Sequence, residues 1–283
     1  MDYRYGNIAQ QIIELQNEDG TWGNEFHCLS IPNSKKLLTT EQALRRLKIL
    51  GFSMQDEPIR KAVDCMQASL IGERRIDDYW EKTHDWELFT QLMLSTWIKI
   101  FDPDNKIALS FAKRWANVIE EAFLDGTYNA EKYQNAYYTE FGKKPRGARE
   151  IDFVTFYHMN LLQGVLPKET ESRMLDYVIN YDKGIYYVYG KRLKDLPKVF
   201  PSLETSRYLA AIEILSKYLL AKQKLAFVVN WAEENRDTLG QWDLGTKVKD
   251  NLYFPLSDSW KNLEVRKADC TERIQAIINR LCD

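Results

Sequence analysis

The residues best suited to chemistry stand between positions 77 and 87 of this chain. The catalytic candidates there are Asp77, Asp78, His84 and Asp85, and the substrate-binding candidates are Trp80 and Trp86. Paired carboxylates beside a histidine can act as general acid and base, and aromatic rings can line a substrate site. The string from Asp77 to Glu81 also has an Asp-Asp-x-x-Glu spacing that suits magnesium and a diphosphate. The alternative is a solvated acidic loop in which Asp85 caps a helix.

A second group of candidates stands near predicted helix starts. Asp152 is a catalytic candidate that opens one helix, and Tyr157 and His158 follow as substrate-binding candidates. An acid in a first turn also complements the helix dipole, and His158 fits a hydrogen-bonded core histidine equally well. Arg207 lies early in another predicted helix, where it can pair with Glu204 or hold a carboxylate or phosphate group of a ligand.

A long irregular stretch, residues 242–269, is rich in Asp, Trp and Tyr. Long segments without regular structure are frequently functional or tightly packed loops. We therefore include Asp258 among the catalytic candidates and Trp260 among the substrate-binding candidates. The alternative is a plug that closes the fold.

Helices must position these residues, because apolar side chains recur at helical spacing along most of the chain. The predicted helices span about residues 3–16, 39–50, 56–70, 84–101, 104–122, 131–141, 151–163, 168–181, 202–220, 222–236 and 264–282. Residues 185–189 form one strand-like run, which predicts half of a small hairpin.

A glycine turn repeats between these helices. Gly20, Gly72, Gly126, Gly184 and Gly240 are separated by 52, 54, 58 and 56 residues, and an aromatic residue follows two positions after each except Gly72. This near-constant period predicts about five helical pairs. Because one helix of each pair is mostly the more apolar, we expect an inner and an outer ring. The predicted fold is an all-α toroid, a single domain covering residues 1–283.

The first sixty residues resemble a known repeat. The pattern is Gln16-x-x-x-Gly20-x-Trp22, followed by Thr39-Thr40-x-x-Ala43-Leu44-x-x-Leu47 and Gly51. It is similar to the QW-type repeat of terpenoid cyclases and protein prenyltransferase subunits. Beyond these residues the resemblance rests on the degenerate glycine repeat and on Gly240-Gln241-Trp242. It implies an α/α toroid in which glutamine and tryptophan tie an outer helix to its neighbour.

The catalytic motifs of those families are not matched. Class II terpene cyclases use an Asp-x-Asp-Asp acid, and Arg75 stands where the first acid of that motif would be. The zinc site of prenyltransferases needs Asp, Cys and His, but no spacing commits His27, His84 or His158 to a metal. We therefore predict no metal site, with Mg²⁺ only if a diphosphate binds.

Composition limits the partners and the cellular location that we expect for this protein. A net charge of −2 argues against sequence-independent nucleic-acid binding. The sequence contains no run of about eighteen apolar residues, so we predict no transmembrane segment. Four scattered cysteines and the lack of a signal peptide predict a cytoplasmic protein. The oligomeric state stays open.

Three hypotheses for the function remain. The first is a small-molecule-binding protein or enzyme that uses an aromatic-lined toroid cavity. The second is a carbohydrate-active toroid with paired carboxylates. The third is a non-catalytic interaction module that has the scaffold without the acid motif.

Overall fold

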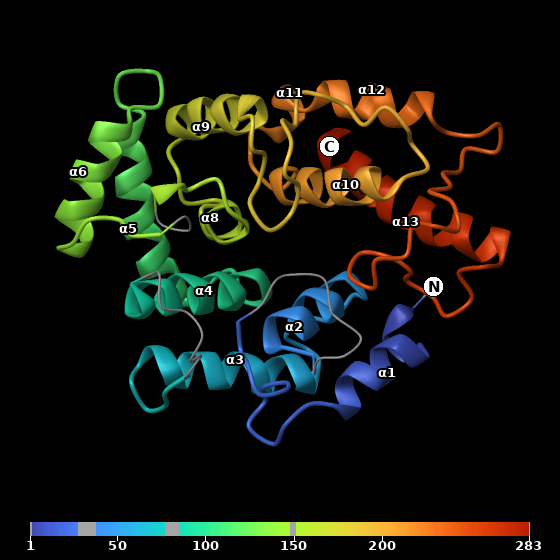
Figure 1. Ribbon diagram of the computed structural model, residues 1–283, viewed down its shortest axis with the longest axis horizontal. Coiled ribbons are helices and arrows are strands. Elements are labelled where there is room, and N and C mark those ends of the chain that lie inside the picture. Colours follow the sequence, from blue (N-terminus) through green and yellow to red (C-terminus); the bar gives the residue numbers. More distant parts are fainter. Residues whose placement is uncertain (1, 28–37, 77–84, 148–150, 283) are drawn as a thin grey trace. The chain divides into compact units, whose positions relative to one another are not determined.

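Regular structure in the described part of this protein is helical (Figure 1). The computed structural model describes residues 2–27, 38–76, 85–147 and 151–282. The helices there are η1 (Tyr3–Tyr5), α1 (Asn7–Glu14), α2 (Thr40–Ile49), α3 (Glu57–Leu70), α4 (Trp86–Phe101), α5 (Lys106–Ala122), α6 (Ala130–Phe141), α8 (Phe156–Leu161), α9 (Lys168–Asn180), α10 (Leu203–Leu215), α11 (Ala221–Lys224), α12 (Ala226–Glu234) and α13 (Leu263–Cys282). The all-α prediction is confirmed for these residues, and the toroid stays a prediction.

Polar side chains set where several helices begin. Thr39 and Gln42 form a capping box at α2. Asn105 caps α5 by accepting two backbone N–H groups. Thr155 caps α8 by accepting the N–H of His158, so this helix starts later and is much shorter than the predicted span of residues 151–163.

The repeated glycines form one kind of turn. The N–H of each donates to the carbonyl three residues earlier at 3.0–3.2 Å, and each φ lies between +59° and +93°; the residues are Gly20, Gly72, Gly126, Gly184 and Gly240. At Gly20 a Cβ would lie 2.5 Å from the Lys61 carbonyl oxygen, so a larger residue would also clash. The sequence repeat is therefore a repeat of backbone structure.

The tryptophans of the first and last glycine turns make the same contact. Trp22 Nε1 donates to the Ile12 carbonyl at 2.7 Å, and Trp242 Nε1 donates to the Ala232 carbonyl at 2.7 Å. Both rings are fully buried. Each ring therefore ties a turn to a carbonyl near the end of the preceding helix, and each carbonyl also accepts a backbone N–H three residues later, from Leu15 at 3.2 Å and from Asn235 at 3.0 Å.

Gln16 connects two helical segments. Its Nε2 donates to the Gly20 carbonyl at 3.0 Å and to the Pro58 carbonyl, in the first turn of α3, at 2.8 Å. The backbone N–H of Trp22 donates to Thr40 Oγ1 at 2.9 Å, which joins the same turn to α2. These hydrogen bonds tie the turn to α3 and to α2.

The residue contacts divide the chain into two compact units. Unit 1 comprises Met1–Asp78, Pro197–Ala210 and Asn230–Ile278, and unit 2 comprises Tyr79–Leu196, Ala211–Val229 and Asn279–Asp283. Unit 2 has an aromatic core that includes Trp97, Trp115, Tyr133, Tyr137 and Phe153. Unit 1 buries aliphatic and aromatic side chains together with several charged ones. A single domain over residues 1–283 stays a prediction.

The strand-like run forms a tight turn. Ile185 and Tyr189 exchange two backbone hydrogen bonds at 2.9 and 3.0 Å, and Tyr187 between them has a φ of +69°. An aromatic residue in this left-handed region costs about 1 kcal/mol. Isolated bridges replace the predicted strand here, one of them between Thr155 and Tyr186.

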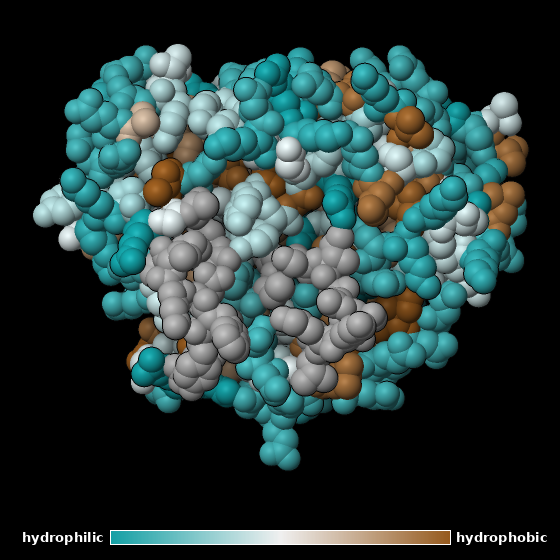
Figure 2. All heavy atoms as spheres, in the orientation of Figure 1, coloured by the Kyte–Doolittle hydropathy of each residue, from teal (hydrophilic) through white to brown (hydrophobic). Residues whose placement is uncertain are grey.

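Hydrophilic residues cover most of the face shown in Figure 2. Large apolar side chains are also exposed; the most exposed are Tyr5, Leu219 and Leu239. Among the described helices, none combines the length and apolar character that crossing a membrane would require.

Candidate functional site

The acidic stretch named first in the sequence is only partly described. Asp77, Asp78, Trp80 and His84 lie outside the described residues. Asp85 caps α4: it accepts the Leu88 N–H at 3.1 Å and pairs with Lys143 Nζ at 2.5 Å.

Burial alone would raise the pKa of Asp85, but the hydrogen bonds from Lys143 and Leu88 outweigh burial and lower that pKa. The contacts of Asp85 are therefore those of a helix cap, which was the alternative to a catalytic role. Trp86 follows as the first residue of α4; it is half-buried, with its ring 5.8 Å from that of Phe89.

Asp258 and Trp260 both make packing contacts in unit 1. Asp258 accepts the N–H groups of Asn7 and Ile8 at 3.1 and 3.3 Å, so it caps α1 from a distant part of the chain. Trp260 is buried and donates its indole N–H to the Thr246 carbonyl at 3.2 Å. Both residues thus make the packing contacts expected if residues 242–269 close the fold, which was the alternative to a functional loop.

Two buried aspartates hold this stretch in place. Asp250 accepts the backbone N–H groups of residues 252–254 at 3.0, 2.7 and 3.1 Å. Asp269 accepts those of Leu256 and Ser257 at 3.2 and 3.0 Å. Asp269 lies within α13. We call residues 250–257 the latched loop.

An arginine of α2 holds the latched loop from the other side. The Arg46 guanidinium donates to the Leu252 carbonyl at 3.1 Å and also to the Pro255 carbonyl. Burial lowers the pKa of Arg46 to about 10, although the negative charge of Asp250 opposes that shift. Carbonyls that the loop cannot pair with itself are thereby satisfied.

Further charges are buried beside the latched loop. The guanidinium carbons of Arg45 and Arg273 lie 4.8 and 5.0 Å from the centre of the Tyr253 ring. His27 and Glu41 form another buried pair in unit 1. These buried charges, which we call the charged centre of unit 1, were not predicted from the sequence. A usable signal was present, because Glu41, Arg45 and Arg46 stand within the apolar pattern of α2.

In unit 2, three half-buried tyrosines form a connected group. The Tyr128 and Tyr177 ring centroids lie 4.7 Å apart at 35°, and those of Tyr177 and Tyr181 lie 5.5 Å apart at 30°. Phe153 stacks on Tyr177 from the core at 5.7 Å. All three tyrosines keep part of their surface in solvent. With Asp152 they form what we call the tyrosine–aspartate cluster.

Asp152 gives this cluster its charge. Its carboxylate accepts the Tyr181 hydroxyl at 2.5 Å and the Val154 N–H at 2.9 Å. Among the described residues, no lysine or arginine forms an ion pair with it. The pKa values of Tyr128, Tyr177 and Tyr181 are all raised, first by burial and also by the negative charge of Asp152.

Tyr157 and His158 belong to the core of unit 2. Tyr157 is fully buried with its ring edge-on to Phe89. His158 Nδ1 lies 2.8 Å from Thr155 Oγ1, and its ring meets Trp115 edge-on at 4.3 Å. Burial lowers the pKa of His158 to about 3, so its imidazole is neutral. His158 is therefore a hydrogen-bonded histidine of the core, which was the alternative to a substrate-binding role.

Arg207 is half-buried on α10, in unit 1. The structure thus assigns Arg207 and Asp258 to unit 1, and Asp85, Asp152, Tyr157 and His158 to unit 2. Among the described candidate residues, only Asp152 accepts a hydrogen bond from the side chain of a half-buried tyrosine, Tyr181, which was not among the residues predicted from the sequence.

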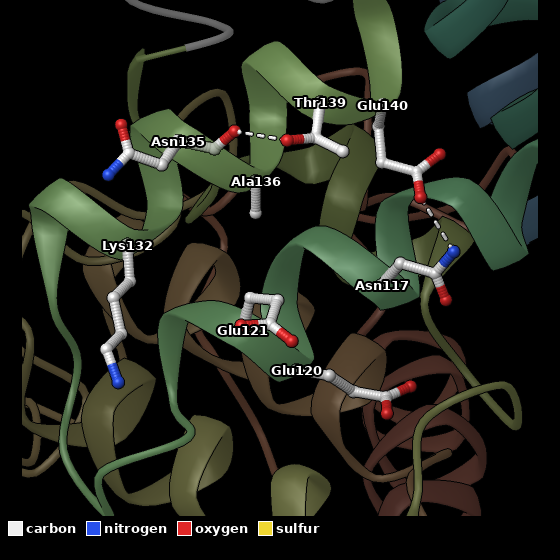
Figure 3. Close-up of a pocket in the computed structure, with 8 residues that line it drawn as sticks. All are labelled: Asn117, Glu120, Glu121, Lys132, Asn135, Ala136, Thr139 and Glu140. Atoms are coloured by element: carbon white, nitrogen blue, oxygen red, sulfur yellow. Dashed lines mark hydrogen bonds between the residues drawn. The ribbon is translucent and has the colours of Figure 1, made fainter.

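A polar groove of about 560 Å³ lies between α5 and α6 (Figure 3). Its lining is Asn117, Glu120, Glu121, Lys132, Asn135, Ala136, Thr139 and Glu140. Small Ala136 faces longer side chains of α5, which leaves room between the helices. Burial and the charge of Glu121 raise the pKa of Glu120. The groove therefore offers carboxylates, amides and a hydroxyl to a polar ligand.

Within the described ranges, His, Cys, Asp and Glu side chains form no group of three or more that could hold a metal ion. No family model matches the chain, and no curated protein or solved structure matches it.

Proposed function

We propose that this protein binds a small molecule at the tyrosine–aspartate cluster of unit 2. The observation that carries the proposal is the hydrogen bond between Asp152 and Tyr181 beside two further half-buried rings. Small-molecule sites combine aromatic surface, which supplies contact area, with a few polar groups that fix orientation. Asp152 and these rings provide both on neighbouring side chains.

Two other observations favour binding over catalysis. Asp85 and Asp258, the other described acids among the candidates, each accept backbone N–H groups at a helix start. General acid–base chemistry needs groups that can exchange protons with a substrate. His158 is fully buried and neutral, so it offers no base beside Asp152.

A thermal-shift screen tests this proposal, because a ligand that binds the folded state raises the melting temperature. The compounds are methylated ammonium salts, isoprenoid alcohols, oligosaccharides, and diphosphates with Mg²⁺. Tyr177→Leu removes the central ring of the cluster, and Tyr5→Leu, at a largely exposed tyrosine of unit 1, is the matched control.

We expect one compound class to raise the melting temperature of the wild-type and Tyr5→Leu proteins but not of Tyr177→Leu. A shift that persists in Tyr177→Leu contradicts the proposed site. No shift with any class contradicts small-molecule binding and favours the interaction-module hypothesis.

The groove between α5 and α6 supports a second candidate function, carbohydrate binding. Its amide, hydroxyl and carboxylate groups match the hydrogen-bonding needs of a polyol, and its volume of about 560 Å³ suits a small ligand. Ala136→Leu would fill the floor of the groove. Under this alternative, oligosaccharides should raise the melting temperature of the wild type and of Tyr177→Leu but not of Ala136→Leu.

A further inference from the structure

We infer that the ligand of the tyrosine–aspartate cluster carries a cationic, methylated ammonium group. This inference rests on the proposed function and names the chemical class that the same site takes. It follows from the charge, the ring chemistry and the hydrogen bonding of the cluster.

The first step concerns charge. Asp152 has no cationic partner among the described residues, and its two printed contacts are with a hydroxyl and a backbone N–H. Those contacts stabilise the carboxylate without neutralising it. A half-buried charge is screened less than a fully solvated one, so a cation beside these rings would be attracted.

The second step concerns how far this charge extends. Its effect reaches Tyr177 and Tyr128 as well as Tyr181, since the negative charge of Asp152 contributes to the raised pKa of all three phenols. A field that opposes a phenolate at all three positions favours a cation at the same positions. The cluster therefore selects against anions, including diphosphates.

The third step concerns the rings. The face of a tyrosine ring carries negative electrostatic potential and attracts cations within about 6 Å of its centroid. Neighbouring centroids in this cluster are 4.7 and 5.5 Å apart at angles of 35° and 30°, so the rings pack on one another and a cationic group would lie over the outer face of one ring. Methylated ammonium groups suit such a site, because they present methyl groups to the rings while remaining charged.

The hydrogen-bonding groups make a sugar a poorer fit. The Tyr181 hydroxyl already donates to Asp152, and the carboxylate can only accept. The hydroxyls of Tyr128 and Tyr177 are the remaining side-chain donors of the cluster, and it offers no amide group of the kind that the groove between α5 and α6 provides. A methylated ammonium group needs no such donors.

Isothermal titration calorimetry with two probes of similar shape tests the inference. Choline carries a trimethylammonium group, and 3,3-dimethylbutan-1-ol replaces it with a neutral tert-butyl group. Asp152→Asn removes the charge of the cluster. Asp258→Asn makes the same change in net charge at the α1 cap of unit 1, and is the control.

We expect choline to bind the wild type at least tenfold more tightly than the neutral alcohol. Asp152→Asn should weaken choline binding at least tenfold, and Asp258→Asn should leave it within twofold. Circular dichroism checks that each variant is folded before titration.

Equal affinity for the two probes, or equal weakening by the two variants, overturns the inference. Binding of a neutral compound or a sugar that is tighter than that of choline and is lost in Tyr177→Leu would also overturn it while leaving the proposed function standing. No binding of any compound overturns both.

Discussion

The two units use buried and half-buried aspartates in different ways. In unit 1, Asp250 accepts three backbone N–H groups and lies in a centre that contains arginines. In unit 2, Asp152 accepts one backbone N–H and one tyrosine hydroxyl, with no cationic partner among the described residues. The first arrangement holds a loop, whereas the second places a carboxylate without a cationic partner among the described residues beside half-buried rings, where we propose that a ligand binds.

The largest effect should come from breaking the latched loop. Asp250→Ala removes the acceptor of three buried N–H groups and a negative charge near Arg46. We expect the free energy of unfolding to fall by about 3 kcal/mol or more. Urea denaturation measures this, with Asp152→Ala as the matched change in unit 2, expected to cost about 1 kcal/mol or less. Equal losses in the two variants would remove the contrast.

The next effect concerns the neutral histidine in the core of unit 2. The pKa of His158 is about 3 in the folded protein, below the value of about 6.5 for an unfolded chain. Between these values the unfolded state binds the proton, so wild-type stability must fall as pH falls. We expect His158 to contribute about 2 kcal/mol of that loss between pH 7 and pH 5.

His158→Gln removes this titration. Urea denaturation of both proteins at several pH values should therefore show a shallower decline for the variant over the same range. Parallel declines would show that His158 is not held neutral in the folded state.

A smaller effect should appear in the ionisation of the tyrosines. Asp152→Asn removes the negative charge that helps to raise the pKa of Tyr181, so that pKa should fall while the contribution of burial remains. Alkaline titration followed by phenolate absorbance measures the change. Asp182→Asn, at an exposed residue paired with Arg192, is the control and should leave the tyrosine titration unchanged. An unchanged titration in Asp152→Asn would contradict the field described for the cluster.

The smallest effect is expected in the groove between α5 and α6. Burial and Glu121 raise the pKa of Glu120, so Glu120→Gln should stabilise the protein at neutral pH by about 0.5 kcal/mol or less. Because the folded state holds the Glu120 proton more tightly, the wild type should regain this difference as pH falls through the carboxyl range. Thermal denaturation at neutral and acidic pH measures it, and a destabilised variant would contradict the electrostatic reasoning.

Local features of the fold were predictable from the sequence. Capping residues, helical periodicity and the glycine repeat indicated the helices, and Gln16 and Trp22 make tying contacts of the expected kind. The main error was the helix predicted over residues 151–163. There Thr155 competes as a cap, and the preceding residues lie beside Tyr186.

The candidate site was only partly predictable. Asp152 was named, but its partners Tyr177 and Tyr181 lie on and just after α9, and sequence spacing does not show which distant segments pack together. Tyr128 did carry a signal, because it is the aromatic residue of the second complete glycine turn, between those of Trp22 and Tyr186. The charged centre of unit 1 was missed because buried arginines resemble a solvated helix face in sequence.

One measurement tests the central claim that the ligand binds in unit 2 rather than at the charged centre of unit 1. The protein is labelled on its tyrosine rings, the resonances are assigned by Tyr→Phe substitution, and NMR spectra are recorded during titration with choline. We predict saturable shifts at Tyr128, Tyr177 and Tyr181 and no shift at Tyr253. Shifts at Tyr253 without shifts at the other three tyrosines would contradict the account.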